Sequence, residues 1–263
     1  MNILRQELRF QTKSIIIWVA TFVLLLVVFM GIFPAFAKEA ATLKLAMAAF
    51  PREMFDSIGM DIDRLFEASG FVSYIYGLIQ LFLAIMGALY GFDVVNREKI
   101  ARMNDFLYVK PIARLSVFGQ KVAAALIGFA IMNGVLFATF QLMAGSWTID
   151  SENLLLINQI ILGGFLLQLL VFALAALFGQ FMRRIKNPVG SATALSFTLF
   201  LILMVGRLMD DDLIKNLTPF GYVQPLEIIT NGLSLRVILA FSGLTLLLLG
   251  ISAWLLSRRD LEV

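Results

Sequence analysis

Six long, uncharged, apolar stretches constrain this chain more than any other feature of its sequence. They occupy residues 14–37, 71–92, 122–147, 154–182, 187–206 and 237–257. About 20 helical residues, each rising 1.5 Å, cross the ~30 Å hydrocarbon core of a bilayer, so each stretch is long enough to span it. With 60% hydrophobic residues, 15% charged residues and a mean hydropathy of +0.90, the chain predicts an all-α membrane protein of six transmembrane helices in one domain, residues 1–263.

Lys and Arg residues are distributed unevenly between the segments that join these stretches. If the N-terminus lies inside, the four inner segments hold three, six, three and two of them, 14 of the 21 in the chain. An excess of Lys and Arg marks the cytoplasmic side of a membrane protein. We therefore expect a multi-pass protein of the cell membrane with both termini in the cytoplasm. Residues 38–70 and 207–236 are then expected outside the cell.

Residues 1–13 predict a short helix that lies in the membrane interface. Arg5, Arg9 and Lys13 recur every four residues, with apolar side chains between them. The tripeptide Ala35-Phe36-Ala37 imitates the cleavage site of a secretory signal. The apolar run before it is longer than the 7 to 15 residues usual for such a signal, which favours a retained first span.

Residues 93–121 join the second and third stretches and have an internal pattern that a simple connection would not need. Ile100, Met103, Phe106 and Leu107 fall on one face of a helix, with charged residues on the other faces. Pro111 disfavours helical geometry at the preceding residue and so ends that helix. The pattern predicts a basic, amphipathic, cytoplasmic helix. Two interpretations remain open: it fits a groove on a soluble partner, or it lies flat on anionic lipid.

The residue types that the chain lacks exclude most chemistry. It contains no Cys and no His, so thiol catalysis, thiolate metal sites and imidazole general bases are absent. Asp61, Asp63 and Glu67 could ligate a cation, but their spacing does not match a calcium loop, and a solvated face is the simpler interpretation. We expect no catalytic residue, no metal site and no cofactor in this chain, which is therefore not expected to be an enzyme.

No Asp, Glu, Lys or Arg lies within any of the six stretches. Ion-coupled carriers commonly keep such groups at mid-membrane, where they are expensive to insert. No Gly-x4-Gly-Lys-Ser/Thr loop is present to hold nucleotide phosphates, so the energy would have to come from an ATP-hydrolysing partner. Neutral polar residues either line a passage or join helices by hydrogen bonds, and the candidates for a passage are Gln80, Asn133, Gln141 and Gln168.

Four segments resemble the type-2 permease subunit of ATP-binding-cassette exporters, and together they extend over nearly the whole chain. The first is similar to an interfacial "elbow" helix, the second to a cytoplasmic coupling segment, the third to a Pro-rich outer stretch and the fourth to a basic ending. Their sequences are LRQELRFQTKSIIIW at residues 4–18, Glu98 with NDFLYVKPIAR at residues 104–114 and Lys121, LTPFGYVQP at residues 217–225, and SRRDL at residues 257–261. The family often has Gly-Thr near Ile100-Ala101-Arg102 and Ser at Ala113, so this chain departs from its pattern there.

The resemblance implies an exporter permease that forms half of a twelve-span pathway with a second copy or a sister permease. It implies a separate nucleotide-binding subunit that carries ATP and Mg, contact with membrane lipid, no nucleic acid, and a bacterial source. The expected docking residues are Glu98, Met103, Phe106, Leu107, Pro111 and Arg114. In this hypothesis Phe106 and Leu107 are apolar anchors, and Glu98 and Arg114 are charge partners at the rim. The alternative is a secondary carrier or channel that ATP does not drive.

Overall fold

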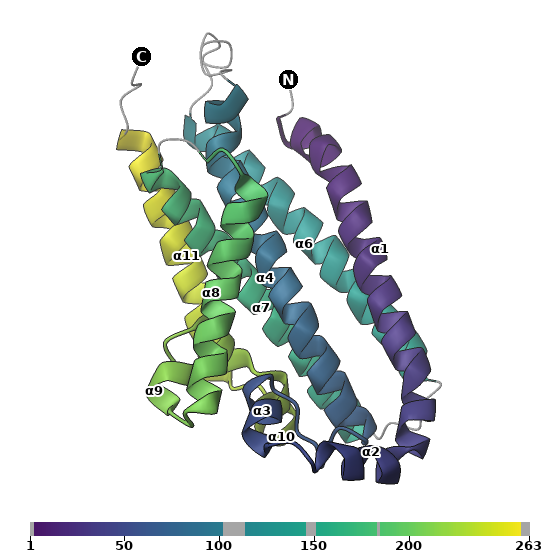
Figure 1. Ribbon diagram of the computed structural model, residues 1–263. Coiled ribbons are helices and arrows are strands. Elements are labelled where there is room, and N and C mark those ends of the chain that lie inside the picture. Colours follow the sequence, from purple (N-terminus) through teal and green to yellow (C-terminus); the bar gives the residue numbers. More distant parts are fainter. Residues whose placement is uncertain (1–2, 102–113, 146–150, 183–184, 259–263) are drawn as a thin grey trace.

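The computed structural model describes residues 3–101, 114–145, 151–182 and 185–258 of the chain. In these ranges the regular structure consists of helices, and six of the helices are long and apolar enough to cross a membrane (Figure 1). The predicted fold class, an all-α protein with six spans, is confirmed for the part of the chain that is described. The six long helices are α1 (Ile3–Lys38), α4 (Ala68–Ala101), α6 (Arg114–Ala144), α7 (Ser151–Phe181), α8 (Pro188–Leu208) and α11 (Leu235–Arg258).

Shorter helices gather at one end of the bundle. They are α2 (Ala40–Met47), α3 (Arg52–Ser57), α9 (Asp212–Lys215), the 3₁₀ helix η1 (Pro219–Val223) and α10 (Pro225–Asn231). In Figure 1, α2, α3, α9 and α10 lie at the opposite end from the start of α1 and the end of α11. We call residues 39–67 and 209–234 the capped end, and the other side the termini end. The two segments expected on one side of the membrane therefore do share one end of the bundle.

Helices α4 and α7 form the centre of the bundle. Most of the residues in their membrane-spanning parts are buried, whereas fewer than a quarter are buried in those of α1, α8 and α11. Small residues bring the two central helices together. A Cβ atom added at Gly87 of α4 would lie 2.5 Å from the carbonyl oxygen of Gln168 in α7, and one at Gly91 would meet the carbonyl oxygen of Phe172. Because no side chain separates the two backbones at these points, α4 and α7 approach more closely than larger residues would allow.

The first helix differs from its prediction. We expected an interfacial helix at residues 1–13 and then a turn into the first span, but α1 is one helix from Ile3 to Lys38. No Gly or Pro interrupts residues 4–18. The buried positions Ile3, Glu7, Gln11 and Ile15 recur every four residues, and α1 packs mainly along α6. This contact with α6 explains why the helix continues without a turn.

The segment expected to couple the bundle to a partner is also partly helical. Helix α4 continues to Ala101, so residues 93–101 prolong the second span, and α6 already begins at Arg114. The predicted amphipathic helix would fall mostly on residues 102–113, which lie outside the described residues. The two long helices that flank it end and begin at the termini end (Figure 1).

Candidate functional site

The predicted docking residues fall on or beside the segment that the structure does not describe. Met103, Phe106, Leu107 and Pro111 lie outside the described residues. Glu98 belongs to the last part of α4, and Arg114 is the first residue of α6. Both helix ends are at the termini end, so these two positions flank the segment from either side. The docking role of all six residues remains a prediction.

Asn133 and Gln168, two of the four predicted pathway residues, bond to each other inside the bundle. Asn133 Nδ2 in α6 donates to Gln168 Oε1 in α7 at 2.8 Å, and also to the carbonyl oxygen of Phe129 at 2.9 Å. Both side chains are buried. Asn133 Oδ1 and Gln168 Nε2 have no hydrogen-bond partner among the described residues. The pair therefore joins two helices while leaving one acceptor and one donor unsatisfied in an apolar core.

The other two predicted pathway residues make similar bonds. Gln80 Nε2 in α4 donates to the carbonyl oxygen of Val223 in η1 at 3.0 Å. Gln141 Nε2 in α6 donates to Asn158 Oδ1 in α7 at 3.1 Å. Hydrogen bonding between elements, the alternative interpretation of these residues, is thus what the structure has at all four positions. That they also line a passage remains a prediction.

A buried ion pair that the sequence analysis did not identify lies near the termini end. Glu7 Oε1 in α1 is 4.0 Å from Lys121 Nζ in α6, and the two side chains are 10% and 5% exposed. Next to them the backbone N–H of Leu4 donates to Gln120 Oε1 at 3.1 Å. The one sequence signal was that Glu7 is the only acidic residue among the first 37. The pair anchors the start of α1 to the beginning of the third span.

Arg207, in the last turn of α8, organises the capped end. Its Nε donates to Gln224 Oε1 at 2.9 Å, and Gln224 Nε2 donates in turn to Glu227 Oε1 at 2.9 Å. Burial raises the pKa of the Glu227 carboxyl, although the positive charge of Arg207 acts in the opposite direction. Gly59, at φ +77°, lies against the guanidinium, and a Cβ atom there would be 2.5 Å from Arg207 Nη1. Arg207 thus connects the fifth span to both segments of the capped end.

A cavity of about 420 Å³ opens beside Arg207. Its lining comes from α3 and the residues that follow it, from the end of α8 with α9, and from the start of α10. A smaller cavity of about 20 Å³ lies on the other side and reaches Ser73 and Gln80 of α4. Arg207, Gly59, Gln224 and Leu226 line both cavities, so these four residues separate the larger one from the interior of the bundle.

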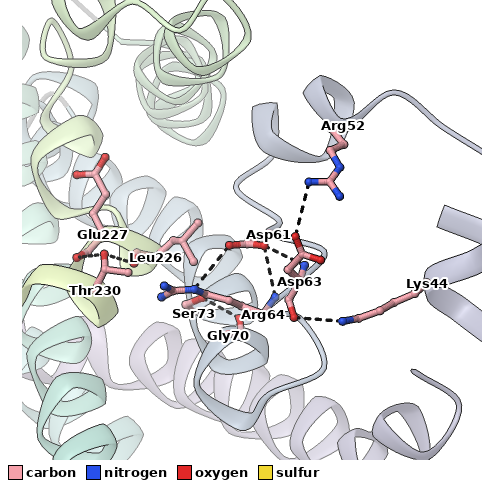
Figure 2. A network of polar contacts seen from close by, with 10 residues as sticks. All are labelled: Lys44, Arg52, Asp61, Asp63, Arg64, Gly70, Ser73, Leu226, Glu227 and Thr230. Atoms are coloured by element: carbon pink, nitrogen blue, oxygen red, sulfur yellow. Dashed lines mark hydrogen bonds and ion pairs between the residues drawn. The ribbon is translucent and has the colours of Figure 1, made fainter. Parts of the chain in front are cut away.

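The acidic residues considered as cation ligands stabilise a turn instead. Asp61 Oδ1 accepts from the backbone N–H groups of Asp63 and Arg64, at 2.9 Å and 3.3 Å. Figure 2 shows this turn tied to its neighbours, with Arg52 3.6 Å from the Asp63 carboxylate and Lys44 bonded to the Asp63 carbonyl oxygen. In the described ranges no group of three or more Asp or Glu residues is arranged to hold a metal ion.

Comparison with known families assigns the chain. Residues 6–255 match the family described as "Multidrug efflux system permease Rv1217c, C-terminal domain". The chain belongs to this family of efflux permeases. Comparison with curated proteins gives no match. The matched region includes all six membrane-spanning helices and both segments of the capped end, so the family assignment applies to the whole bundle described above.

In this efflux permease the residues that sequence reasoning missed are those whose role depends on distant contacts. Arg207 was counted only as a charge of an outer segment, yet it is partly buried between the two segments of the capped end. Its position directly after an uncharged stretch was a weak signal, because charges commonly end a span. The glycine that accommodates it, Gly59, lies far away in the chain and gave no signal of its own.

Proposed function

We propose that this permease is the membrane subunit of a type-2 ATP-binding-cassette exporter. The observation that carries the proposal is the family match, which extends over residues 6–255 and therefore over all six spans. The four sequence segments that resemble type-2 permeases support the finer assignment. The proposed activity is export of a small molecule, and separate subunits hold and hydrolyse ATP with Mg.

The position of buried charge supports a source of energy outside the chain. Among the described residues the buried charged side chains are Glu7 and Lys121, both near the termini end. Proton- or ion-coupled carriers commonly keep ionisable groups near the middle of the membrane. The buried charges of this efflux permease lie near one end of its bundle. This position favours a conformational change driven by a partner over coupling to an ion gradient.

Docking of the ATP-hydrolysing partner is assigned to the segment between the second and third spans, residues 93–121. Phe106 and Leu107 are the proposed apolar anchors, and truncating or charging such an anchor commonly costs an interface about 2 kcal/mol or more. Phe106→Asp is expected to abolish co-purification of the partner and ATP hydrolysis coupled to the permease. Leu213→Asp is the matched control, because Leu213 is 83% exposed in α9 at the opposite end. Unchanged co-purification with Phe106→Asp would rule out this docking surface.

Pairing with a second six-span unit is the proposed assembly. Helices α1 and α8 lie on either side of α4 in Figure 1, and both are apolar with few buried residues. A second copy or a sister permease would cover part of this surface, and lipid would cover the rest. Mass measurement of the permease released from nanodiscs tests this directly. A complex that contains the ATP-hydrolysing partner but only one permease chain would contradict the twelve-span arrangement.

The alternative is a secondary carrier or channel, and energy dependence separates the two. Efflux from proteoliposomes that contain the permease and its partner should require ATP and stop with vanadate, but continue in the presence of a protonophore. The reverse pattern would indicate a carrier. The proposed orientation, with both termini in the cytoplasm of a bacterial cell, predicts that a reporter fused after Val263 is active inside the cell. Activity of that reporter only outside the cell would overturn it.

A further inference from the structure

The larger cavity at the capped end has charged groups that the protein itself leaves without partners. Arg207 uses Nε for its bond to Gln224, while its terminal Nη1 and Nη2 atoms have no acceptor among the described residues. Lys215 is different, because its ammonium group is bonded to Asp210 at 2.8 Å and Asp212 at 3.2 Å. One guanidinium fork therefore remains available to an anionic group in the cavity.

Acidic side chains of α3 line the same cavity. Glu53 and Asp56, both on α3, line the cavity, and their carboxylates have no hydrogen bond or ion pair among the described residues. They are exposed, so they form the rim, whereas Arg207 is partly buried where the cavity meets the bundle. A simple anion would be repelled by these carboxylates, and a simple cation would leave the guanidinium fork empty. A ligand with both charges can pair with the guanidinium and with the carboxylates.

The size, position and apolar lining of the cavity restrict the ligand further. About 420 Å³ is within the ~300–1,000 Å³ typical of small-molecule sites. Met60, Leu208 and Leu226 also line the cavity and make part of its surface apolar. Arg207 is in the last turn of α8, a membrane-spanning helix, so the cavity lies where a span ends. A small zwitterion or the headgroup of a zwitterionic lipid can reach such a position.

We propose that this cavity binds a zwitterion that joins a phosphate or carboxylate to an ammonium group. The anionic group is held by the terminal nitrogens of Arg207, and the ammonium group is held by Glu53 and Asp56. Gln224 accepts a hydrogen bond from Arg207 Nε and donates one to Glu227, which also lines the cavity. Gly59 keeps the space beside the guanidinium free of a side chain. Binding at this site needs neither ATP nor a partner subunit, so a failure of this proposal can be distinguished from a failure of the proposed transport function.

The test uses glycerophosphoethanolamine as a soluble zwitterion, with glycerol 3-phosphate and ethanolamine as its separate halves. Each is titrated by calorimetry into the full-length chain purified in detergent. We expect the zwitterion to bind at least about tenfold more tightly than either half, because a charged hydrogen-bonded contact commonly contributes about 10-fold to 100-fold in affinity. Arg207→Gln should weaken the binding of the zwitterion and the binding of glycerol 3-phosphate by similar factors. The double variant Glu53→Gln with Asp56→Asn should weaken the binding of the zwitterion but not the binding of glycerol 3-phosphate.

Two controls keep the test informative. Arg64→Gln and Asp63→Asn change charges of the capped end that do not line the cavity, and both should bind like the unchanged protein. If Arg207→Gln unfolds the capped end, Arg207→Lys and the exposed α3 variants still test the assignment, since Lys keeps the charge but loses the fork. Equal binding of the zwitterion and glycerol 3-phosphate, or binding that ignores Arg207, overturns the proposal.

A lipid arm identifies the source of the zwitterion. The chain is placed in nanodiscs of phosphatidylethanolamine or of phosphatidylglycerol, and retained lipid is measured by native mass spectrometry. Retention of phosphatidylethanolamine that is lost with Arg207→Gln indicates a lipid headgroup, even where the soluble probe binds weakly. Tight binding of the soluble probe without lipid retention indicates a soluble zwitterion. Absence of both effects overturns the site.

Discussion

The close contact between α4 and α7 makes the sharpest prediction about stability. Gly87→Ala adds a Cβ atom 2.5 Å from the carbonyl oxygen of Gln168, whereas ordinary contact begins near 3.4 Å. The two backbones must therefore separate by about 0.9 Å at this point, the difference between those two distances. The obstacle is the backbone of a packed helix and not the end of a flexible side chain, so the separation has to extend along the helices.

The size of the effect follows from two opposing terms. A gap of 0.5–1 Å removes roughly a quarter to a half of the dispersion energy of each contact, and overpacking commonly costs about 1–3 kcal/mol. Ala in place of Gly favours a helix by about 0.5–1 kcal/mol. Gly87→Ala should therefore lower the free energy of unfolding by roughly 0.5–2 kcal/mol. Gly91→Ala, which meets the carbonyl oxygen of Phe172, should act in the same direction.

Matched controls lie on α6. Apart from the backbone of their own helix, no described atom lies within 4 Å of a Cβ added at Gly119 or Gly134. Gly119→Ala and Gly134→Ala should therefore be neutral or stabilise by up to about 1 kcal/mol. Reversible unfolding in mixed micelles of increasing sodium dodecyl sulfate, followed by circular dichroism, measures all four variants. The double variant of Gly87 and Gly91 should lose less than the sum of the single losses, because one separation relieves both contacts. If Gly87→Ala behaves like Gly134→Ala, the close approach of α4 and α7 is wrong.

Three further predictions concern polar groups. Glu7→Gln should lower the free energy of unfolding by about 1.5–3 kcal/mol through the buried pair with Lys121, and adding Lys121→Met should recover part of it, as the same micelle titration would show. Asn133→Leu should cost about 0.6–1.7 kcal/mol by removing the bond to Gln168, whereas Thr139→Ala, whose hydroxyl bonds within its own helix, should be near neutral; equal losses would contradict the role of the α6–α7 bond. Burial raises the pKa of Glu227, so the folded chain binds a proton there more tightly than the unfolded chain, and stability should fall as pH rises from about 4.3 and level off above the raised pKa. Glu227→Gln keeps the acceptor for Gln224 and should flatten this part of the profile of melting temperature against pH. If the variant and the unchanged protein had the same profile, the pH dependence would not come from Glu227.

The six spans could be predicted because a local property defines them. Bilayer thickness sets a minimum length of about 20 residues, and a charge inside that length is expensive, so an uncharged stretch is sufficient evidence for a span. The helix ends are less predictable, because they depend on contacts. Helix α4 runs beyond residue 92 to Ala101, and α6 begins at Arg114, before the expected start at residue 122. The polar residues 93–101 and 114–121, next to the second and third stretches, contain no Gly-Pro or similar signal that would end a helix, so the helices continue through them.

The continuity of α1 and the role of Arg207 could not be predicted, because both depend on residues far apart in the chain. The start of α1 is held by residues of α6 that are 116 positions away at the bond between Leu4 and Gln120. Arg207 is enclosed by Gly59, whose positive φ is set by its turn, and by Gln224. A pattern along the chain identifies Arg207 as a charge after a span, but only the fold shows what it touches.

One continuous helix, α4, connects the two ends of the bundle, and this connection is relevant to the proposed function. Helix α4 extends without interruption from Ala68, beside the capped end, to Ala101, beside the proposed docking segment. The glycine contacts bind it to α7, so a force applied at residues 93–101 would move α4 and α7 together instead of bending one of them. At the far end the small cavity beside Arg207 is lined by Gln80 of α4 and Leu203 of α8, so this movement would change the surroundings of Arg207. Closure of the ATP-hydrolysing partner at the termini end would thus change the larger cavity at the capped end by moving α4 and α7 together. Gly87→Ala, which loosens that pair, should then reduce export per ATP hydrolysed while leaving co-purification of the partner intact.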